Sequence, residues 1–179
     1  MEKTKKERRG GARLQPPEKK KHYGTTLLRL LLLVAVVSLL LLTLFTQVFS
    51  IVHYYGDSME PSLEDRQILV VRKTDKVHRG DIAAFYYNNK VLVRRIIAEG
   101  GTSLEIERNG QVIIDGNVLE ESYVAELALG QCNISFPYTV PSEEFFVMGD
   151  NRPIAMDSRL KEIGSVPRDR ILGKVIFSF

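Results

Sequence analysis

Three short segments carry the polar side chains best suited to catalysis or binding. In residues 56–63, glycine and proline impose a tight, irregular backbone around Ser58. Arg94 and Arg95 are two adjacent cations within an apolar run, and residues 148–159 form a polar loop after another apolar run. Each segment alone is typical of scaffolding, namely a turn serine, a structural salt bridge and a hydrogen-bonded loop.

The elements that must position these residues are short β-branched or aromatic runs bounded by Gly, Asn, Asp or Pro. Such runs predict β-strands at Gln67–Arg72, Asp81–Tyr87, Lys90–Ile97, Gln111–Ile114, Glu144–Met148 and Ile171–Phe177. In a strand, Arg94 and Arg95 point to opposite faces, so at least one of them faces a core or a cleft. The predicted fold class is therefore mainly β, with antiparallel sheets.

Turn signals join these predicted strands into hairpins. The pair Asn88-Asn89 predicts one tight turn, and Asn109-Gly110 with Asp115-Gly116 predicts two more in a small meander. Helical periodicity is poor in this region, and Glu120–Leu129 is the one short segment that we expect to be helical.

An apolar run at residues 25–49 precedes the β-rich region and predicts one transmembrane helix, since about 20 residues cross a ~30 Å hydrocarbon core. Residues 1–24 hold nine Lys or Arg against three acids, whereas residues 50–179 hold 15 against 19. This asymmetry predicts a disordered cytoplasmic tail and an exported C-terminal domain. A cleaved signal peptide is the less favoured alternative, because no cleavage site with small residues follows the run.

Composition limits the other classes of function. The basic tail is compatible with nucleic-acid binding, but its position next to the apolar run already explains its charge, so we expect no nucleic-acid partner.

Cys132 is the only cysteine, which excludes an intrachain disulfide. The sequence has no Cys/His cluster and no glycine-rich phosphate motif, so we expect neither a metal nor a cofactor.

In this order behind an apolar helix, the segments resemble the type I signal peptidases, membrane-bound serine proteases that remove signal peptides from exported proteins. The resemblance covers residues ~25–179 and is closest to the compact Gram-positive type. It is carried by Ser58-Met59-x-Pro61, Arg79-Gly80-Asp81-Ile82, Gly149-Asp150-Asn151-Arg152 with Asp157-Ser158-Arg159, and Asp115-Gly116-Asn117 with Glu121-Ser122-Tyr123.

The resemblance implies a tail at residues 1–24, a transmembrane helix at 25–49 and an exported catalytic domain at 50–179, with a small β appendage at about 101–146. It implies Ser58 as the nucleophile of a Ser/Lys dyad, with signal peptides of exported preproteins and the lipid bilayer as partners. The oxyanion would be held by backbone N–H groups. The implied supporting residues are Gly56, Met59, Pro61, Arg95, Gly149, Asp150, Asn151, Arg152, Asp157, Ser158 and Arg159.

The chain departs from the family where the catalytic lysine belongs, because that position is Arg94. Arginine keeps its proton in proteins and cannot act as a general base. Lys90 lies four residues away, about 13 Å along a strand, which is too far to serve Ser58. Ala155 also stands where the family usually carries a serine that contacts the lysine.

Three interpretations follow from Arg94. The chain is an active peptidase with another proton acceptor, such as Asp157 or a water. It is instead a catalytically silent relative that binds secretory or pilin-type substrates as a chaperone or assembly factor. Or it is a lysine-to-arginine variant of an active enzyme. His53, beside Tyr54, is interpreted as a marker of the membrane interface, and His78 as a loop residue, so neither is a convincing base.

Overall fold

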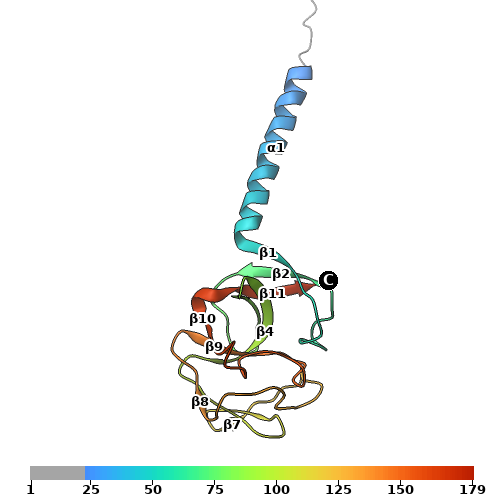
Figure 1. The fold of residues 1–179 in the computed structure, drawn as a ribbon. Helices are drawn as coiled ribbons and strands as arrows, with labels where there is room; N and C mark the ends of the chain where they lie inside the picture. The colour runs from blue at the N-terminus through green and yellow to red at the C-terminus, as the bar shows by residue number, and fades with distance from the viewer. Residues whose placement is uncertain (1–22) are drawn as a thin grey trace, which may run out of the picture. The chain divides into compact units, whose positions relative to one another are not determined.

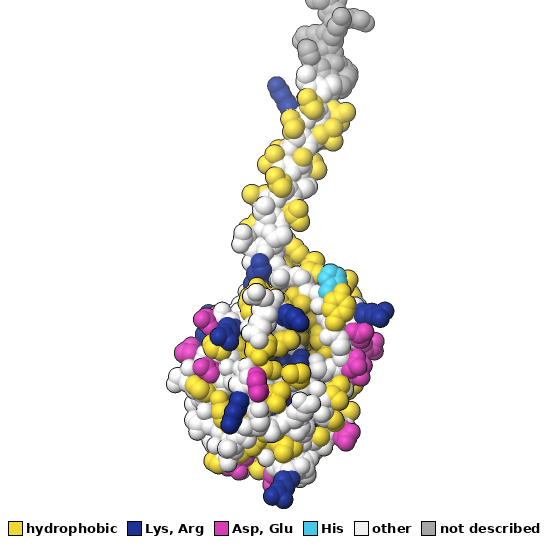
Figure 2. Space-filling model, in the orientation of Figure 1, with side chains coloured by type: hydrophobic (Ala, Val, Ile, Leu, Met, Phe, Trp, Pro, Cys, Tyr) yellow, Lys and Arg dark blue, Asp and Glu magenta, His cyan; other side chains and the backbone are white. Residues whose placement is uncertain are grey.

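The computed structural model describes residues 23–179 (Figure 1), so the predicted tail lies outside the described residues except for its last two positions. Helix α1 runs from Tyr23 to Val48. Its visible face is covered with apolar side chains (Figure 2), and within the described residues it is the one helix long and apolar enough to cross a membrane. The chain divides into two units after Leu41, and the unit that contains the β-rich region is described below by itself.

Two antiparallel sheets make up the β-rich region. In spatial order, the larger sheet consists of β1 (Phe49–His53), β2 (Ile68–Lys73), β11 (Ile171–Ser178), β3 (Ile82–Tyr87), β4 (Lys90–Glu99), β9 (Glu144–Met148) and β10 (Val166–Pro167). The smaller sheet consists of β7 (Asn117–Val118), β6 (Val112–Ile114), β5 (Ser103–Ile106) and β8 (Tyr138–Thr139). A short 3₁₀ helix, Arg168–Arg170, precedes β11. The predicted fold class, mainly antiparallel β after one apolar helix, is confirmed.

The smaller sheet lies within residues 101–146, where the sequence predicts a small β appendage. In Figure 1 its strands β7 and β8 lie at the end of the β-rich region opposite β1 and β2. Its apolar side chains pack with residues from β4 and β9, including Phe146 and Met148. The two sheets therefore share a buried cluster at the junction between them.

The hairpin of β3 and β4 fixes where the two adjacent arginines lie. Its turn is closed by the pair Tyr87 and Lys90, and Asn88 and Asn89 both adopt positive φ angles, 45° and 58°. Such angles suit a two-residue hairpin turn, so the turn predicted from the sequence is confirmed. The resulting register places Arg94 opposite Ala83 on β3.

The predicted helix at Glu120–Leu129 is wrong, because this segment is a series of turns and irregular backbone. Its polar groups are used in tertiary contacts rather than in helical hydrogen bonds. The carboxylate of Glu121 binds Arg152, and the carbonyls of Ala128 and Leu129 accept from Arg159. These contacts with buried arginines outweigh the weak helical preference of a ten-residue segment.

Candidate functional site

Ser58 lies in a tight turn between β1 and β2, at the edge of the larger sheet. Gly56 has a φ angle of 98°, which a glycine adopts without strain, and its N–H donates to Asp65 Oδ1 at 2.7 Å. Met59 is fully buried in a cluster with Leu63 and side chains of β2, β3 and β4. The Glu60–Pro61 peptide bond is cis. Burial of Met59 fixes the turn, while Ser58 itself stays half-buried and accessible.

The Ser58 hydroxyl has a tyrosine as its hydrogen-bond partner. Tyr54 Oη lies 3.1 Å from Ser58 Oγ, and the same phenol oxygen accepts a hydrogen bond from the Met59 N–H at 3.0 Å. Within residues 23–179, the N–H of Ser58 itself donates no hydrogen bond. Tyr54 is only 4% exposed, so its side chain lies in the core under the turn.

The loop after β9 holds the Ser58 turn through its backbone. Asn151 donates from its backbone N–H to the Ser58 carbonyl and from Nδ2 to the Asp57 carbonyl, both at 3.1 Å. A Cβ at Gly149 would lie 2.5 Å from the Ser58 carbonyl oxygen and 2.4 Å from the Cβ of Ala155. Glycine is therefore the residue that permits this close approach of the two segments.

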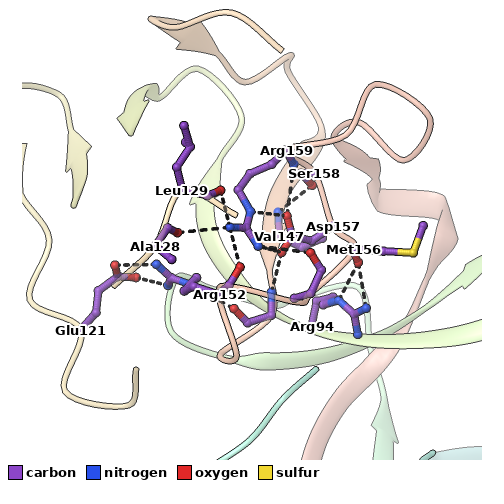
Figure 3. A network of polar contacts seen from close by, with 12 residues as sticks. Arg94, Glu121, Ala128, Leu129, Val147, Arg152, Met156, Asp157, Ser158 and Arg159 are labelled. Carbon is purple, nitrogen blue, oxygen red and sulfur yellow. Dashed lines mark hydrogen bonds and ion pairs between the residues drawn. The ribbon is translucent and has the colours of Figure 1, made fainter. Parts of the chain in front are cut away.

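Arg94 projects from β4 toward the Ser58 side of the sheet, and its guanidinium rests on backbone carbonyls (Figure 3). Its Nε and Nη2 donate to the Met156 carbonyl at 3.0 and 2.8 Å. Its Nη1 donates to the Val93 carbonyl at 2.6 Å. Met156 directly follows Ala155, which is buried. The guanidinium is thus held by main-chain acceptors from β4 and from the loop after β9.

Arg94 is 6% exposed and has no hydrogen-bonded carboxylate within the described residues. Burial lowers its pKa, while the charges of Asp157, Tyr54 and Asp150 oppose that change. The ordinary arginine pKa lies so far above neutral pH that the side chain still acts as a fixed cation.

Arg95 faces the other side of β4, as strand alternation requires. It forms a bidentate pair with Asp150 at 2.8 and 2.5 Å, and donates to the Gly80 carbonyl at 2.8 Å and to Ser62 Oγ at 3.0 Å. Its guanidinium also lies 3.9 Å from the centre of the Tyr123 ring. Arg95 therefore joins the Ser58 turn, the start of β3 and the loop after β9.

Arg152 connects the same loop to the irregular segment that replaces the expected helix. It donates to the Gly149 carbonyl at 3.0 Å and forms a bidentate pair with Glu121 at 2.9 and 2.5 Å (Figure 3). Burial and the hydrogen bond that Tyr123 donates to Glu121 raise the pKa of Tyr123, so its hydroxyl remains a donor near neutral pH. This arrangement fixes the loop from the side of the smaller sheet.

Asp157 and Arg159 form a fully buried pair, also drawn in Figure 3. Asp157 accepts from Arg159 at 2.8 and 2.7 Å and from the Gly149 N–H at 2.9 Å, while Ser158 Oγ accepts from the Val147 N–H at 3.0 Å. None of these contacts reaches Ser58. The structure therefore favours a structural role for Asp157 over the role of proton acceptor for Ser58.

A groove of about 680 Å³ passes over Ser58, with mostly apolar walls. Ser58, Tyr54 and Arg94 all line it, and His53 and Lys90 lie along the same groove. His78 lies elsewhere, with its side chain 75% exposed and 3.6 Å from Glu99. The remaining wall is formed by residues 50–52 and 91–93, Tyr55, Tyr86 and Leu172.

Sequence comparisons place the chain among known proteins. The family model described as signal peptidase, peptidase S26, matches residues 27–179. Signal peptidase I S of Bacillus subtilis is 35% identical over 136 residues, covering 69% of this chain and 73% of the relative. A probable signal peptidase I-1 of Synechocystis is 36% identical over 138 residues, covering 69% of this chain and 67% of the relative. The chain therefore belongs to the signal peptidase family, as the resemblance predicts.

Among solved structures, the crystal structure of a signal peptidase I from Enterococcus faecalis is 31% identical to this chain. The two superpose with a TM-score of 0.48, covering 57% of this chain and 97% of that one.

Proposed function

We propose that the chain is a membrane-anchored serine endopeptidase that removes signal peptides from exported proteins, with Ser58 as its nucleophile. Family membership supports the class of reaction. The observation that carries the assignment is a half-buried serine hydroxyl in an apolar groove, on a turn held by Asn151, with a polar partner at 3.1 Å. The supporting residues act indirectly, because they hold the two loops that meet at Ser58. These residues are Arg95, Asp150, Arg152, Asp157 and Arg159.

In this proposal, the signal peptide binds in extended form along the groove, and Ser58 Oγ attacks the carbonyl at the cleavage site. The free N–H of Ser58 donates to the oxyanion of the tetrahedral intermediate. The family resemblance implies small residues at the −1 and −3 positions of the substrate. The acyl ester on Ser58 is then hydrolysed by water, and these steps require no cofactor.

The membrane assignment is part of the same proposal. Helix α1 is long enough to span a bilayer, and the excess of basic residues precedes it in the sequence. The positive-inside rule then puts residues 1–24 in the cytoplasm and the β-rich region on the other side, where signal peptides emerge.

Replacing Ser58 by alanine should lower the cleavage rate at least ~1,000-fold, because no nucleophile remains. The measurement uses the full chain in detergent micelles and a synthetic preprotein, with both products followed by mass spectrometry. Ser135→Ala, at an exposed serine outside the groove, is the matched control and should leave the rate unchanged. Equal cleavage by the Ser58→Ala variant and the parent would show that another residue is the nucleophile.

A catalytically silent binding protein is the second candidate function. It is favoured by the buried cation Arg94, which the family resemblance puts at the position of the general base. In that case the parent should bind a signal peptide in the groove, as measured by fluorescence anisotropy, and leave it uncleaved.

Asn151 offers a milder test of the site. Asn151→Ala should lower kcat about 10-fold with KM nearly unchanged, since the Ser58 turn loses the side-chain hydrogen bond to the Asp57 carbonyl. Asn133→Ala removes an amide that bonds the Lys161 and Glu162 segment instead, outside the groove, and should leave kcat at the parent value. An unchanged kcat for Asn151→Ala would mean that this bond does not position Ser58.

A further inference from the structure

The attack by Ser58 needs a proton acceptor, and the residue at the family's lysine position is not one. Arg94 has no lone pair available on its charged guanidinium and directs its N–H groups to the Met156 and Val93 carbonyls. Within residues 23–179, the side chain hydrogen-bonded to Ser58 Oγ is that of Tyr54. The phenol of Tyr54 is therefore the side-chain group placed to exchange a proton with the Ser58 hydroxyl.

We propose that the Tyr54 phenolate accepts the Ser58 proton, in place of the missing lysine amine. The inference rests on the proposed peptidase function. As Ser58 Oγ attacks the scissile carbonyl carbon, its O–H bond breaks and the proton moves to the Tyr54 oxygen, while the carbonyl π pair moves to the substrate oxygen. On collapse, the C–N bond breaks, and the leaving amine takes the proton from Tyr54.

Deacylation repeats the sequence with water as the nucleophile. Water gives a proton to the Tyr54 oxygen as its oxygen attacks the ester carbon. The C–O bond to Ser58 then breaks, and Ser58 Oγ takes the proton back, so the hydroxyl and the phenolate are both restored. Each bond broken is matched by one formed, and no further reactant is needed.

Phenol is a chemically suitable substitute for a lysine amine. Tyrosine and lysine have similar reference pKa values, about 10 and 10.4, whereas that of arginine exceeds 12. The family's lysine must also give up its proton near neutral pH. A tyrosine therefore loses its proton near neutral pH at about the same cost as a lysine, whereas an arginine keeps its proton.

Hydrogen-bond partners converge on the Tyr54 oxygen. The Met59 N–H donates to that oxygen at 3.0 Å, and the Ser58 hydroxyl lies 3.1 Å away. The fixed cation of Arg94 lines the same groove. The oxygen that receives the proton in this proposal therefore already has hydrogen-bond partners on the Ser58 turn.

The electrostatic coupling is visible from the Arg94 side as well. Burial lowers the pKa of Arg94, and charge on Tyr54 is one of the causes that raise it, after Asp157. The proposed step thus places negative charge on a residue that interacts with the Arg94 cation. In this proposal, Arg94 is a positioning residue and Tyr54 touches the reacting oxygen.

A purely structural role for Tyr54 makes a different prediction, because its hydroxyl also holds the Met59 N–H. Four full-length proteins in detergent micelles separate the two roles: the parent, Tyr54→Phe, Arg94→Lys, and Arg94→Lys with Tyr54→Phe. Steady-state kcat and KM are measured on one synthetic preprotein. In the parent, Tyr54→Phe should lower kcat at least ~100-fold, the size of a lost general base. In the Arg94→Lys background, where a lysine amine is available, the same change should lower kcat less than ~5-fold.

The remaining outcomes overturn the inference in distinguishable ways. Equal kcat for the parent and Tyr54→Phe, or an equal loss in both backgrounds, overturns the role of Tyr54 and leaves the peptidase function intact. Cleavage by Arg94→Lys but not by the parent shows that the parent has no proton acceptor. Cleavage by none of the four overturns the proposed function itself. Thermal unfolding checks the fold, and Tyr54→Phe should melt within about 4 °C of the parent.

Discussion

Replacing Asp157 by asparagine should destabilise the β-rich region by about 3–5 kcal/mol, because it leaves the fully buried Arg159 guanidinium without its counter-charge. Domains of this size are stable by roughly 5–15 kcal/mol, so this loss is a large share of the total. Asp157 also accepts the Gly149 N–H, so the loop that supports Ser58 loses order together with the fold. Urea unfolding of the full chain in micelles, followed by tyrosine fluorescence, measures the difference.

The control makes the same chemical change at an exposed pair. Glu143 binds Arg168 at 2.6 Å, but its side chain is 75% exposed. Glu143→Gln should therefore cost less than about 1 kcal/mol. Similar losses in unfolding free energy for the two variants would show that burial does not determine what the Asp157 pair contributes. They would contradict the structural role assigned to Asp157 in the loop after β9.

Much of the larger sheet could be predicted from its sequence, because β-branched runs, turn residues and strand alternation are local signals. The hairpin at Asn88-Asn89 and the opposite orientation of Arg94 and Arg95 followed from backbone geometry alone. Strand β1 was not predicted, because Phe49–His53 directly continues the apolar run of the helix and becomes a strand by pairing with β2.

The chemistry of the site was harder to predict, since it depends on contacts between segments far apart in sequence. The partner of Arg94 is the Met156 carbonyl, 62 residues away, and no residue type identifies a backbone acceptor. Tyr54 lies four residues before Ser58, yet its contact with the serine depends on how the chain turns after β1. The family resemblance pointed to Arg94 in the sequence, and the three-dimensional arrangement was needed to bring Tyr54 next to Ser58.

Replacing Arg94 by methionine should lower kcat at least ~100-fold while the protein stays folded. At an effective dielectric constant near 20, opposite charges a few ångströms apart interact by a few kcal/mol, which corresponds to at least about 100-fold in rate. If Arg94 stabilises the negative charge that Tyr54 and the oxyanion carry during the reaction, this stabilisation is lost. KM should change little, because methionine preserves the apolar walls of the groove.

The fold should tolerate Arg94→Met, because the change removes a buried charge along with its hydrogen bonds to the Met156 and Val93 carbonyls. Arg108→Met, at an exposed arginine in a loop of the smaller sheet, is the matched control and should leave kcat unaltered. An Arg94→Met protein as active as the parent would show that the cation takes no part in the reaction. A loss in kcat for Arg94→Met that Arg108→Met does not share would instead identify the Arg94 cation as a group that the reaction requires.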